Sequence, residues 1–244
     1  MMKRKVNIMP MAGDGIRLQN AGYRVPKPLI EIRGEPMFIK SAKCMPEADL
    51  WIFITKKSFI QNNKIDEIIK KNFVNSKIIT VDETTEGQAS SCYLSKKFLE
   101  DDDSIFINSC DSFISYDEKE FEIKKDISDI IVFSTDVKKV HKENPNSYGW
   151  IQKNKFEKLN LSCKKPFSEK LENERPIVGS FAFTKSSIFI KSLEKIFFKK
   201  LKINNEYYLD MAISASIDLG YKISEIKVNE YFDLGSGEEL KNLR

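Results

Sequence analysis

The stretch that decides the fold is Met11-Ala12-Gly13-Asp14-Gly15-Ile16-Arg17, with Pro26-Lys27-Pro28-Leu29 close behind it. It directly follows a short apolar run, Val6–Met9, which predicts a buried strand. Two glycines on either side of one residue let the backbone turn sharply, so that successive N–H groups can point inward as a cradle for anionic oxygens. We therefore expect a strand and then an anion-binding loop at the start of the chain.

Two cations accompany this loop. Arg17 has a planar, permanently charged guanidinium that suits phosphate, and Lys27 adds a compact ammonium. Pro26 and Pro28 fix φ on both sides of Lys27, which limits where that ammonium can go. Backbone amides, a guanidinium and an ammonium in one segment favour a polyphosphate ligand.

Three other nucleotide-binding loops do not fit this segment. The dinucleotide fingerprint requires G-x-G-x-x-G, but Leu18 stands where the third glycine would be. The P-loop needs Gly-Lys-Ser/Thr, which does not occur after this strand. The Gly-rich loop of protein kinases also needs the third glycine, and no His-Arg-Asp element follows.

Strands and helices alternate along the first half of the chain. Apolar runs predict strands, and segments with helical period predict helices between them. The expected strands are Val6–Met9, Trp51–Ile54, Lys77–Val81, Ile105–Ile107 and Ile130–Phe133. The expected helices are Met37–Met45, Ile65–Asn72 and a third that Thr85 would cap, with Ala89, Cys92, Tyr93 and Leu94 on one side. This rhythm predicts a largely parallel sheet with helices on its faces.

The second half has shorter predicted elements. We expect strands at Gly149–Gln152, Phe167–Lys170, Val178–Phe183 and Val228–Phe232, with helices near Ser187–Phe197 and Glu206–Leu219. No linker or internal repeat divides the chain. With 244 residues, 41% of them hydrophobic, the chain is most simply one domain.

Composition and charge exclude several classes of protein. The formal charge of +4 is too balanced to favour nucleic acid. The four cysteines lie far apart with no C-x-x-C spacing, so we expect reduced thiols and neither a zinc site nor a disulfide framework. The apolar run after Lys5 is short and broken by Asn7, unlike a secretory signal, and no segment approaches a membrane span. We expect a soluble, cytoplasmic protein that binds neither nucleic acid nor membrane.

The chain has one histidine, His141, in a polar stretch. We expect it on the surface. Ser-His-Asp and Cys-His schemes would both have to use it, so nucleophilic acyl transfer is disfavoured.

An acidic residue follows each of two predicted strands. Asp111 lies just beyond Ile105–Ile107, and Asp233 follows Val228–Phe232 and precedes a glycine turn. Either aspartate alone is more often a cap or turn residue, but open α/β sheets bind ligands at the carboxyl ends of their strands. Carboxylates on rigid elements, with oxygens of a bound nucleotide, suit Mg²⁺. We therefore expect Asp111 and Asp233 to hold Mg²⁺.

The pattern Gly-x-Gly-x-Arg followed by Pro-Lys-Pro-Leu resembles the signature of the sugar-1-phosphate nucleotidyltransferases, which make nucleotide sugars. The resemblance covers most of the chain, although Ala12 stands where the commonest family loop has glycine. It implies a single α/β domain over residues 1–244, with a Rossmann-like (glycosyltransferase-A-like), mostly parallel mixed sheet. Residues 1–140 would form a nucleotide-binding half and residues 141–244 an acceptor-binding half.

The resemblance also implies roles for individual residues. The residues that would contact the nucleotide are Met11, Ala12, Gly13, Gly15, Glu86, Gly87 and Gln88, and those that would contact the acceptor are Gly149, Glu169, Gly179 and Glu206. Asp111 and Asp233 would bind the metal, and Arg17, Lys27 and Lys170 would be the catalytic cations. Lys170 comes from Ser168-Glu169-Lys170, which is similar to a Glu-Lys-Pro element of the family but has Leu171 in place of the proline. Glu206 is also read as an ordinary acid at the start of a helix.

The implied reaction joins a nucleoside triphosphate to a small phosphorylated acceptor, with Mg²⁺ and release of pyrophosphate. A sugar 1-phosphate for surface polysaccharide is the usual acceptor in the family, but similar short enzymes act as cytidylyltransferases on non-sugar phosphates such as phosphocholine. A glycosyltransferase on the same kind of fold usually carries Asp-x-Asp at the central strand, where Cys110-Asp111-Ser112 has one acid. A non-catalytic sensor would be expected to lack the metal acids or the arginine. A homodimer is the expected assembly.

Overall fold

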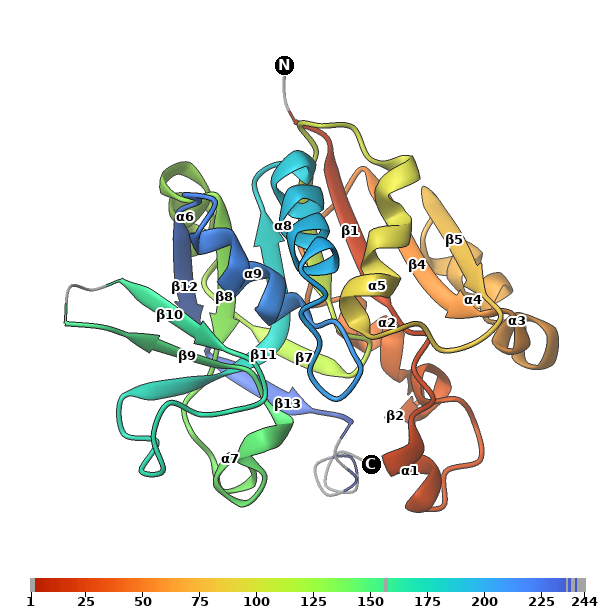
Figure 1. Cartoon of the computed structure of the whole chain (residues 1–244). Coiled ribbons are helices and arrows are strands. Elements are labelled where there is room, and N and C mark those ends of the chain that lie inside the picture. Colours follow the sequence, from red (N-terminus) through yellow and green to blue (C-terminus); the bar gives the residue numbers. More distant parts are fainter. Residues whose placement is uncertain (1–2, 156–157, 236, 238–239, 241–244) are drawn as a thin grey trace.

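The structure is a computed structural model that describes residues 3–155, 158–235, 237 and 240. Its centre is a nine-stranded mixed sheet (Figure 1). Four parallel strands follow one another across the sheet in the order β5 (Ser76–Val81), β4 (Leu50–Lys56), β1 (Lys5–Pro10) and β6 (Ser104–Asn108). The sheet continues through β11 (Glu174–Phe183), β8 (Ile130–Ser134) and β12 (Ile223–Lys227), of which β11 alone runs in the opposite direction to these neighbours. The expected largely parallel α/β sheet is confirmed.

A hairpin branches from the start of β11. It consists of β9 (Trp150–Lys153) and β10 (Leu159–Ser162), both antiparallel to their neighbours. Two short strands, β7 (Ser112–Ser115) and β13 (Glu230–Asp233), pair with each other away from the main sheet. The other elements are α1 (Ile16–Asn20), the 3₁₀ turn Lys27–Leu29, β2 (Glu31–Ile32), β3 (Glu35–Pro36), α3 (Lys57–Asn63), the 3₁₀ turn Leu94–Phe98, α7 (Lys139–Glu143) and the 3₁₀ turn Pro145–Ser147.

Helices cover both faces of the sheet. One core packs α5 (Gln88–Tyr93), α8 (Ser186–Phe198) and α9 (Leu209–Ile217) on alternate strand residues such as Ile8 and Ile107. The other core packs α2 (Met37–Ala42), α4 (Ile65–Asn72) and α6 (Glu118–Ile127) on the opposite side chains of the same strands, such as Met9 and Phe106. The strands are nearly continuous apolar runs because both of their faces are buried.

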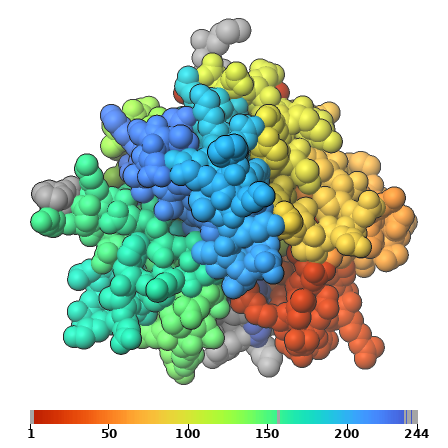
Figure 2. All heavy atoms as spheres, in the orientation of Figure 1, coloured from red at the N-terminus to blue at the C-terminus, as the bar shows by residue number. Residues whose placement is uncertain are grey.

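The helices on the front of the sheet join the two halves of the chain. In Figure 2, α8 and the segment that contains α5 pack side by side over the front of the molecule. The longest helix in the described part of the chain, α8, has 13 residues, and no described helix is long and apolar enough to cross a bilayer.

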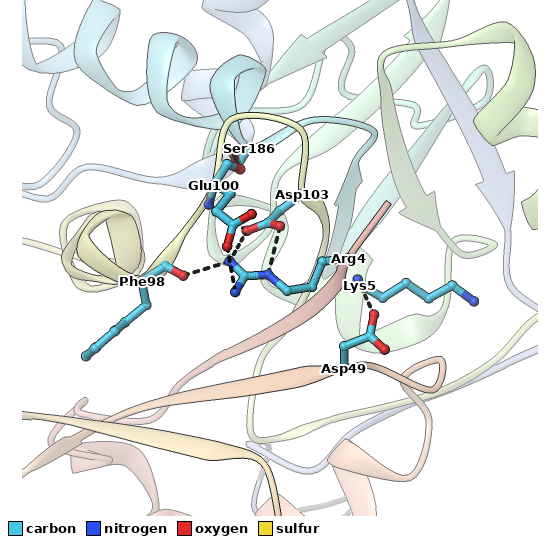
Figure 3. Close-up of polar contacts among 7 residues, drawn as sticks. All are labelled: Arg4, Lys5, Asp49, Phe98, Glu100, Asp103 and Ser186. Atoms are coloured by element: carbon cyan, nitrogen blue, oxygen red, sulfur yellow. Dashed lines mark hydrogen bonds and ion pairs between the residues drawn. The ribbon is translucent and has the colours of Figure 1, made fainter. Parts of the chain in front are cut away.

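The amino-terminal edge of the strands is held by an ion pair with a buried carboxylate and by hydrogen bonds (Figure 3). Arg4 donates to both carboxylate oxygens of Asp103, at 2.9 and 2.7 Å, and to the carbonyl of Phe98. The Lys5 amide donates to Asp49 at 2.7 Å. Asp103 is therefore a structural residue at this edge, and open α/β sheets bind ligands at the opposite edge, where the carboxyl ends of the parallel strands lie.

Several predicted elements differ from the structure. The expected strand Phe167–Lys170 is wrong, because the Phe167 and Ser168 amides donate to the Glu174 carboxylate instead of to a strand. Thr85 is not a cap, because Gly87 holds the N-cap position and the Thr85 hydroxyl bonds Ser91. The last predicted strand, Val228–Phe232, is shifted in the structure, where β13 spans Glu230–Asp233 and Val228 lies between the end of β12 and the start of β13.

Candidate active site

A cleft of about 340 Å³, lined by both polar and apolar residues, opens beyond the carboxyl ends of β1 and β6. Residues from distant parts of the sequence line it. We call the part formed by Gly13, Gly15, Arg17 and Lys27 the loop end, and the part formed by Gly149, Lys164, Glu206 and Asp210 the turn end. Asp111 and Asp233 also line the cleft.

The loop after β1 is held by its own backbone and by its neighbours. The Met11 amide donates to the Ile54 carbonyl at 2.8 Å and so extends the pairing of β1 with β4. Gly15 has a φ of 66°, a conformation that glycine adopts without strain, and it precedes α1. Arg17 is exposed and lines the cleft, and within the part of the chain that the structure describes its guanidinium makes no hydrogen bond or ion pair. Its guanidinium is therefore available to an anion.

Lys27 is directed toward the carboxylates of the cleft. The proline before it and the proline after it place it at the start of a 3₁₀ turn, and its ammonium forms an ion pair with Asp111. Burial alone would lower the pKa of Lys27, but the charge and the hydrogen bond of Asp111, with the charge of Asp233, outweigh burial and raise that pKa above its ordinary value. Lys27 therefore remains a cation over the whole physiological range.

Asp111 and Asp233 are brought together by the pairing of β7 with β13. Asp233 lies opposite Ser112, and the Leu234 amide donates to the Asp111 carbonyl at 2.9 Å. Gly235 must lack a side chain here, because a Cβ atom would overlap the Asp111 carboxylate and lie 3.1 Å from the Asp233 carboxylate. The two aspartates are 122 positions apart in sequence but adjacent in space.

The two carboxylates respond differently to the same surroundings. Burial would raise the pKa of Asp111, but Lys27 and Arg17 outweigh it, and the pKa is lowered. Burial and then the charge of Asp111 raise the pKa of Asp233. Two adjacent carboxylates with hard oxygen donors fit a divalent cation such as Mg²⁺, which takes part of its ligands from a bound phosphate.

The segment 85–88 joins the loop end to the turn end. Gly87 has a φ of 101°, and its Cβ atom would lie 2.5 Å from the Tyr207 carbonyl oxygen. The Tyr207 amide donates to the Glu86 carbonyl at 2.8 Å. Gln88 lines the cleft and donates to the Ser109 hydroxyl at 2.9 Å. The Glu86 side chain pairs instead with Lys202, at 2.7 Å, and lies outside the cleft lining.

The turn end is built around a two-residue hairpin turn. Asn204 and Asn205 both have positive φ, and Ile203 and Glu206 exchange backbone hydrogen bonds across them. Asn-Asn is a favoured pair for such a turn because asparagine tolerates left-handed φ. Glu206 therefore projects from a tight turn and does not open a helix, since α9 begins at Leu209.

Asp210 and Lys164 complete the turn end. Asp210 is buried, and burial raises the pKa of its carboxyl although the Cys163 thiol hydrogen-bonds to it. Gly149 must lack a Cβ atom, which would overlap Asp210 Oδ2. The Lys164 ammonium lies 4.9 Å from the centre of the Tyr208 ring and donates to the Ser147 carbonyl. The turn end thus combines carboxylates, a cation and an aromatic ring.

The cleft gathers most of the residues singled out in the sequence. Met11, Ala12, Gly13, Gly15, Arg17, Lys27, Gly87, Gln88, Asp111, Gly149, Gly179, Glu206 and Asp233 all line it. Glu86, Glu169 and Lys170 do not, and Glu169 and Lys170 are exposed. Sequence reasoning missed Lys164, although a Lys-Pro pair, Lys165-Pro166, directly follows it and would have directed attention there.

His141 is not on the surface, contrary to the prediction. It is fully buried, its Nδ1 accepts from the Lys138 amide at 2.9 Å, and its ring packs edge-on against Tyr148. Burial and then the charge of Lys138 lower the pKa of His141 to about 4. His141 does not line the cleft and is a neutral core residue near neutral pH.

A sequence model of the nucleotidyl transferase family matches residues 7–241. A search of curated protein sequences finds no match. Among solved structures, the chain is similar to a nucleoside-diphosphate-sugar pyrophosphorylase from Vibrio cholerae RC9, with a TM-score of 0.76 at 18% identity over 97% of this chain and 98% of that one. It is also similar to an inositol-1-phosphate CTP transferase from T. maritima, with a TM-score of 0.71 at 13% identity over 97% and 91%. A UTP-bound UGPase from Acinetobacter baumannii gives a TM-score of 0.69 at 14% identity over 99% and 92%.

Proposed function

Because the chain belongs to the nucleotidyl transferase family, we propose that it couples a nucleoside triphosphate to a sugar 1-phosphate and releases pyrophosphate. The observation that carries the proposal is the cleft itself, where Arg17 and Lys27 face the same space as the paired carboxylates of Asp111 and Asp233. A cationic loop beside an acidic pair suits a triphosphate and its metal.

The proposed chemistry is an in-line displacement at phosphorus. An oxygen of the acceptor phosphate attacks the α-phosphorus, a new P–O bond forms, and the bond from the α-phosphorus to the bridging oxygen breaks as pyrophosphate leaves. Positioning and neutralisation of charge are enough for such a reaction, so no protein nucleophile is required. This agrees with a cleft whose thiol, Cys110, has a pKa raised by burial to about 12.

Each charged group has a place in this scheme. The Gly13 and Gly15 amides and Arg17 bind the pyrophosphate that leaves, and Lys27 holds the α-phosphoryl group or the acceptor phosphate. Asp111 and Asp233 are the residues that would hold Mg²⁺, which supplies charge neutralisation at the reacting phosphates when it is bound. The sequence predicted that Lys170 binds the acceptor phosphate, and in this scheme Lys164 has that role instead.

The turn end supports a hydroxyl-bearing acceptor. Glu206 lies on a rigid turn and faces the cleft, where a carboxylate can accept hydrogen bonds from sugar hydroxyls. The similar structures are named for nucleotide sugars, for inositol 1-phosphate and for UTP, which agrees with a phosphorylated polyol as acceptor. Supply of a precursor for surface polysaccharide is the role that we propose for the product.

The test is a screen for pyrophosphate release with Mg²⁺. CTP, UTP, dTTP, GTP and ATP are each combined with sugar 1-phosphates and with non-sugar phosphates such as phosphocholine. Release that requires one triphosphate together with one sugar 1-phosphate supports the proposal. Release only with a non-sugar phosphate would replace the acceptor class. No release, together with tight binding of a finished nucleotide sugar, would favour a glycosyltransferase.

A further inference from the structure

The loop that the proposed function assigns to the triphosphate contains a carboxylate. Asp14 stands between Gly13 and Gly15, and it is the only acid between Met11 and Arg17. A carboxylate in a polyanion-binding loop repels its ligand unless its charge is compensated. The contacts of Asp14 show how this chain compensates it.

Asp14 is held by two residues from other segments. One carboxylate oxygen forms an ion pair with the ammonium of Lys56, the last residue of β4. The other accepts a hydrogen bond from the Thr84 hydroxyl at 2.8 Å. These contacts lower the pKa of Asp14, with the Lys56 hydrogen bond as the first cause, so the carboxylate is charged at neutral pH.

The same contacts turn the carboxylate away from the cleft. Gly13, Gly15 and Thr84 line the cleft, whereas neither Asp14 nor Lys56 is among the described residues that do. The Asp14 carbonyl also accepts from the Gln19 side chain at 2.7 Å, which fixes the loop on the side of α1. The Lys56 side chain is only 13% exposed and extends from a rigid strand, so it is a firm anchor.

We propose that Lys56 is a positioning residue for the nucleotide, which acts through Asp14. It neutralises the carboxylate of the phosphate-binding loop and holds it outside the cleft, so that the loop presents its amides and Arg17 to the triphosphate. This inference rests on the proposed function, because it assigns the triphosphate to the loop end. It adds a residue that contacts neither the cleft nor the reacting atoms.

The test measures triphosphate binding directly, without acceptor, by titration calorimetry with Mg²⁺. The ligand is whichever of CTP, UTP, dTTP, GTP and ATP binds the wild-type protein. Lys56→Met leaves Asp14 charged and unpaired with Lys56, so we expect its Kd to rise by about tenfold or more, as for an uncompensated charge at close range. Lys56→Arg keeps the ion pair and should stay within about threefold of wild type.

Two further variants test whether the change in Kd comes from the Asp14–Lys56 ion pair and not from a general effect on the structure. Asp14→Asn combined with Lys56→Met removes both charges and should recover most of the lost affinity. Lys57→Met removes the same charge one residue further on, where Lys57 lies 3.8 Å from the exposed Asp82 carboxylate, and should not change the Kd. Melting temperatures of all variants check that they are folded.

In turnover, Lys56→Met should raise KM for the triphosphate but leave KM for the acceptor and kcat close to wild type. An unchanged Kd in Lys56→Met would overturn the inference. So would an equal loss in Lys56→Met and in the double variant, because Lys56 would then not act through Asp14. If the wild-type protein binds none of the five triphosphates, the proposed function fails and the inference falls with it. If the wild-type protein binds a triphosphate and Lys56→Met binds it with the same Kd, the inference is overturned but the proposed function is not.

Discussion

The loop end of the cleft draws Gly13, Gly15, Arg17 and Lys27 from one short stretch, whereas the turn end takes its residues from three separate segments. At the loop end, backbone amides and two cations lie in one segment that directly follows β1, and we propose that they bind an anion. At the turn end, Lys164, Glu206 and Asp210 meet only because β10, a hairpin turn and α9 pack together. Under the proposed function, a local motif would bind the triphosphate, and tertiary contacts would form the site of the acceptor.

Asp111, the carboxylate that pairs with Lys27 of the loop end, should control the rate of the reaction. We expect Asp111→Asn to lower kcat by about 10²-fold or more, the scale of a lost electrostatic group in a transition state. It removes one carboxylate charge and leaves Lys27 without its ion-pair partner. Initial rates of pyrophosphate release at saturating substrates measure the effect, and the melting temperature controls for folding. Wild-type activity in this variant would remove the assignment of Asp111 to the metal.

The turn end should control the affinity for the acceptor. We expect Lys164→Met to raise KM for the acceptor by about tenfold or more, as for a lost hydrogen bond to a charged group, with little change in KM for the triphosphate. Lys170→Met is the matched control, because Lys170 is exposed and outside the cleft lining. Steady-state kinetics with each substrate varied in turn compare the two variants. A larger effect at Lys170 would reverse the placement of this cation.

Crowding at the turn end offers a smaller, structural test. Gly149→Ala places a methyl group against the buried Asp210 carboxylate, so we expect a loss of stability of about 1–3 kcal/mol from overpacking. The acceptor KM should rise with it, because Asp210 and its neighbours must shift. Urea unfolding and the acceptor KM are measured on the same preparation. Wild-type stability would mean that Asp210 moves freely, and the turn end would then be adaptable.

The last prediction concerns pH and lies outside both ends of the cleft. The pKa of His141 is about 4 in the folded protein, below the ordinary value near 6.5 of an unfolded chain. The unfolded state therefore binds the proton first as the pH falls, so stability is complete above about 6.5 and declines toward 4. Urea midpoints between pH 7 and 4 should fall less steeply in His141→Gln than in wild type. Parallel curves would indicate that His141 is not buried as a neutral ring.

Local patterns predicted the frame of the molecule well. The parallel strands of the first half are confirmed. In β1, β4 and β6 the predicted apolar runs are buried on both faces, and this pattern requires no knowledge of the neighbours. The predictions that are wrong concern segments whose surroundings are set by residues outside the segment. The segment Phe167–Lys170 is predicted to be a strand, but its first two amides, those of Phe167 and Ser168, donate to the Glu174 carboxylate. His141 lies in a polar stretch, but the rings that bury it come from Tyr148 and Tyr231.

The sequence by itself determined the loop end, because glycine φ, proline φ and the charges of Arg17 and Lys27 act within one short segment. Only the tertiary structure decided which lysine reaches the turn end, how Asp14 is compensated, and that Asp111 and Asp233 are adjacent. The physical reason is the distance along the sequence between the residues that interact. Backbone conformation is set by near neighbours, whereas the pairing of β7 with β13 and the contact of Lys56 with Asp14 depend on how the whole sheet is packed.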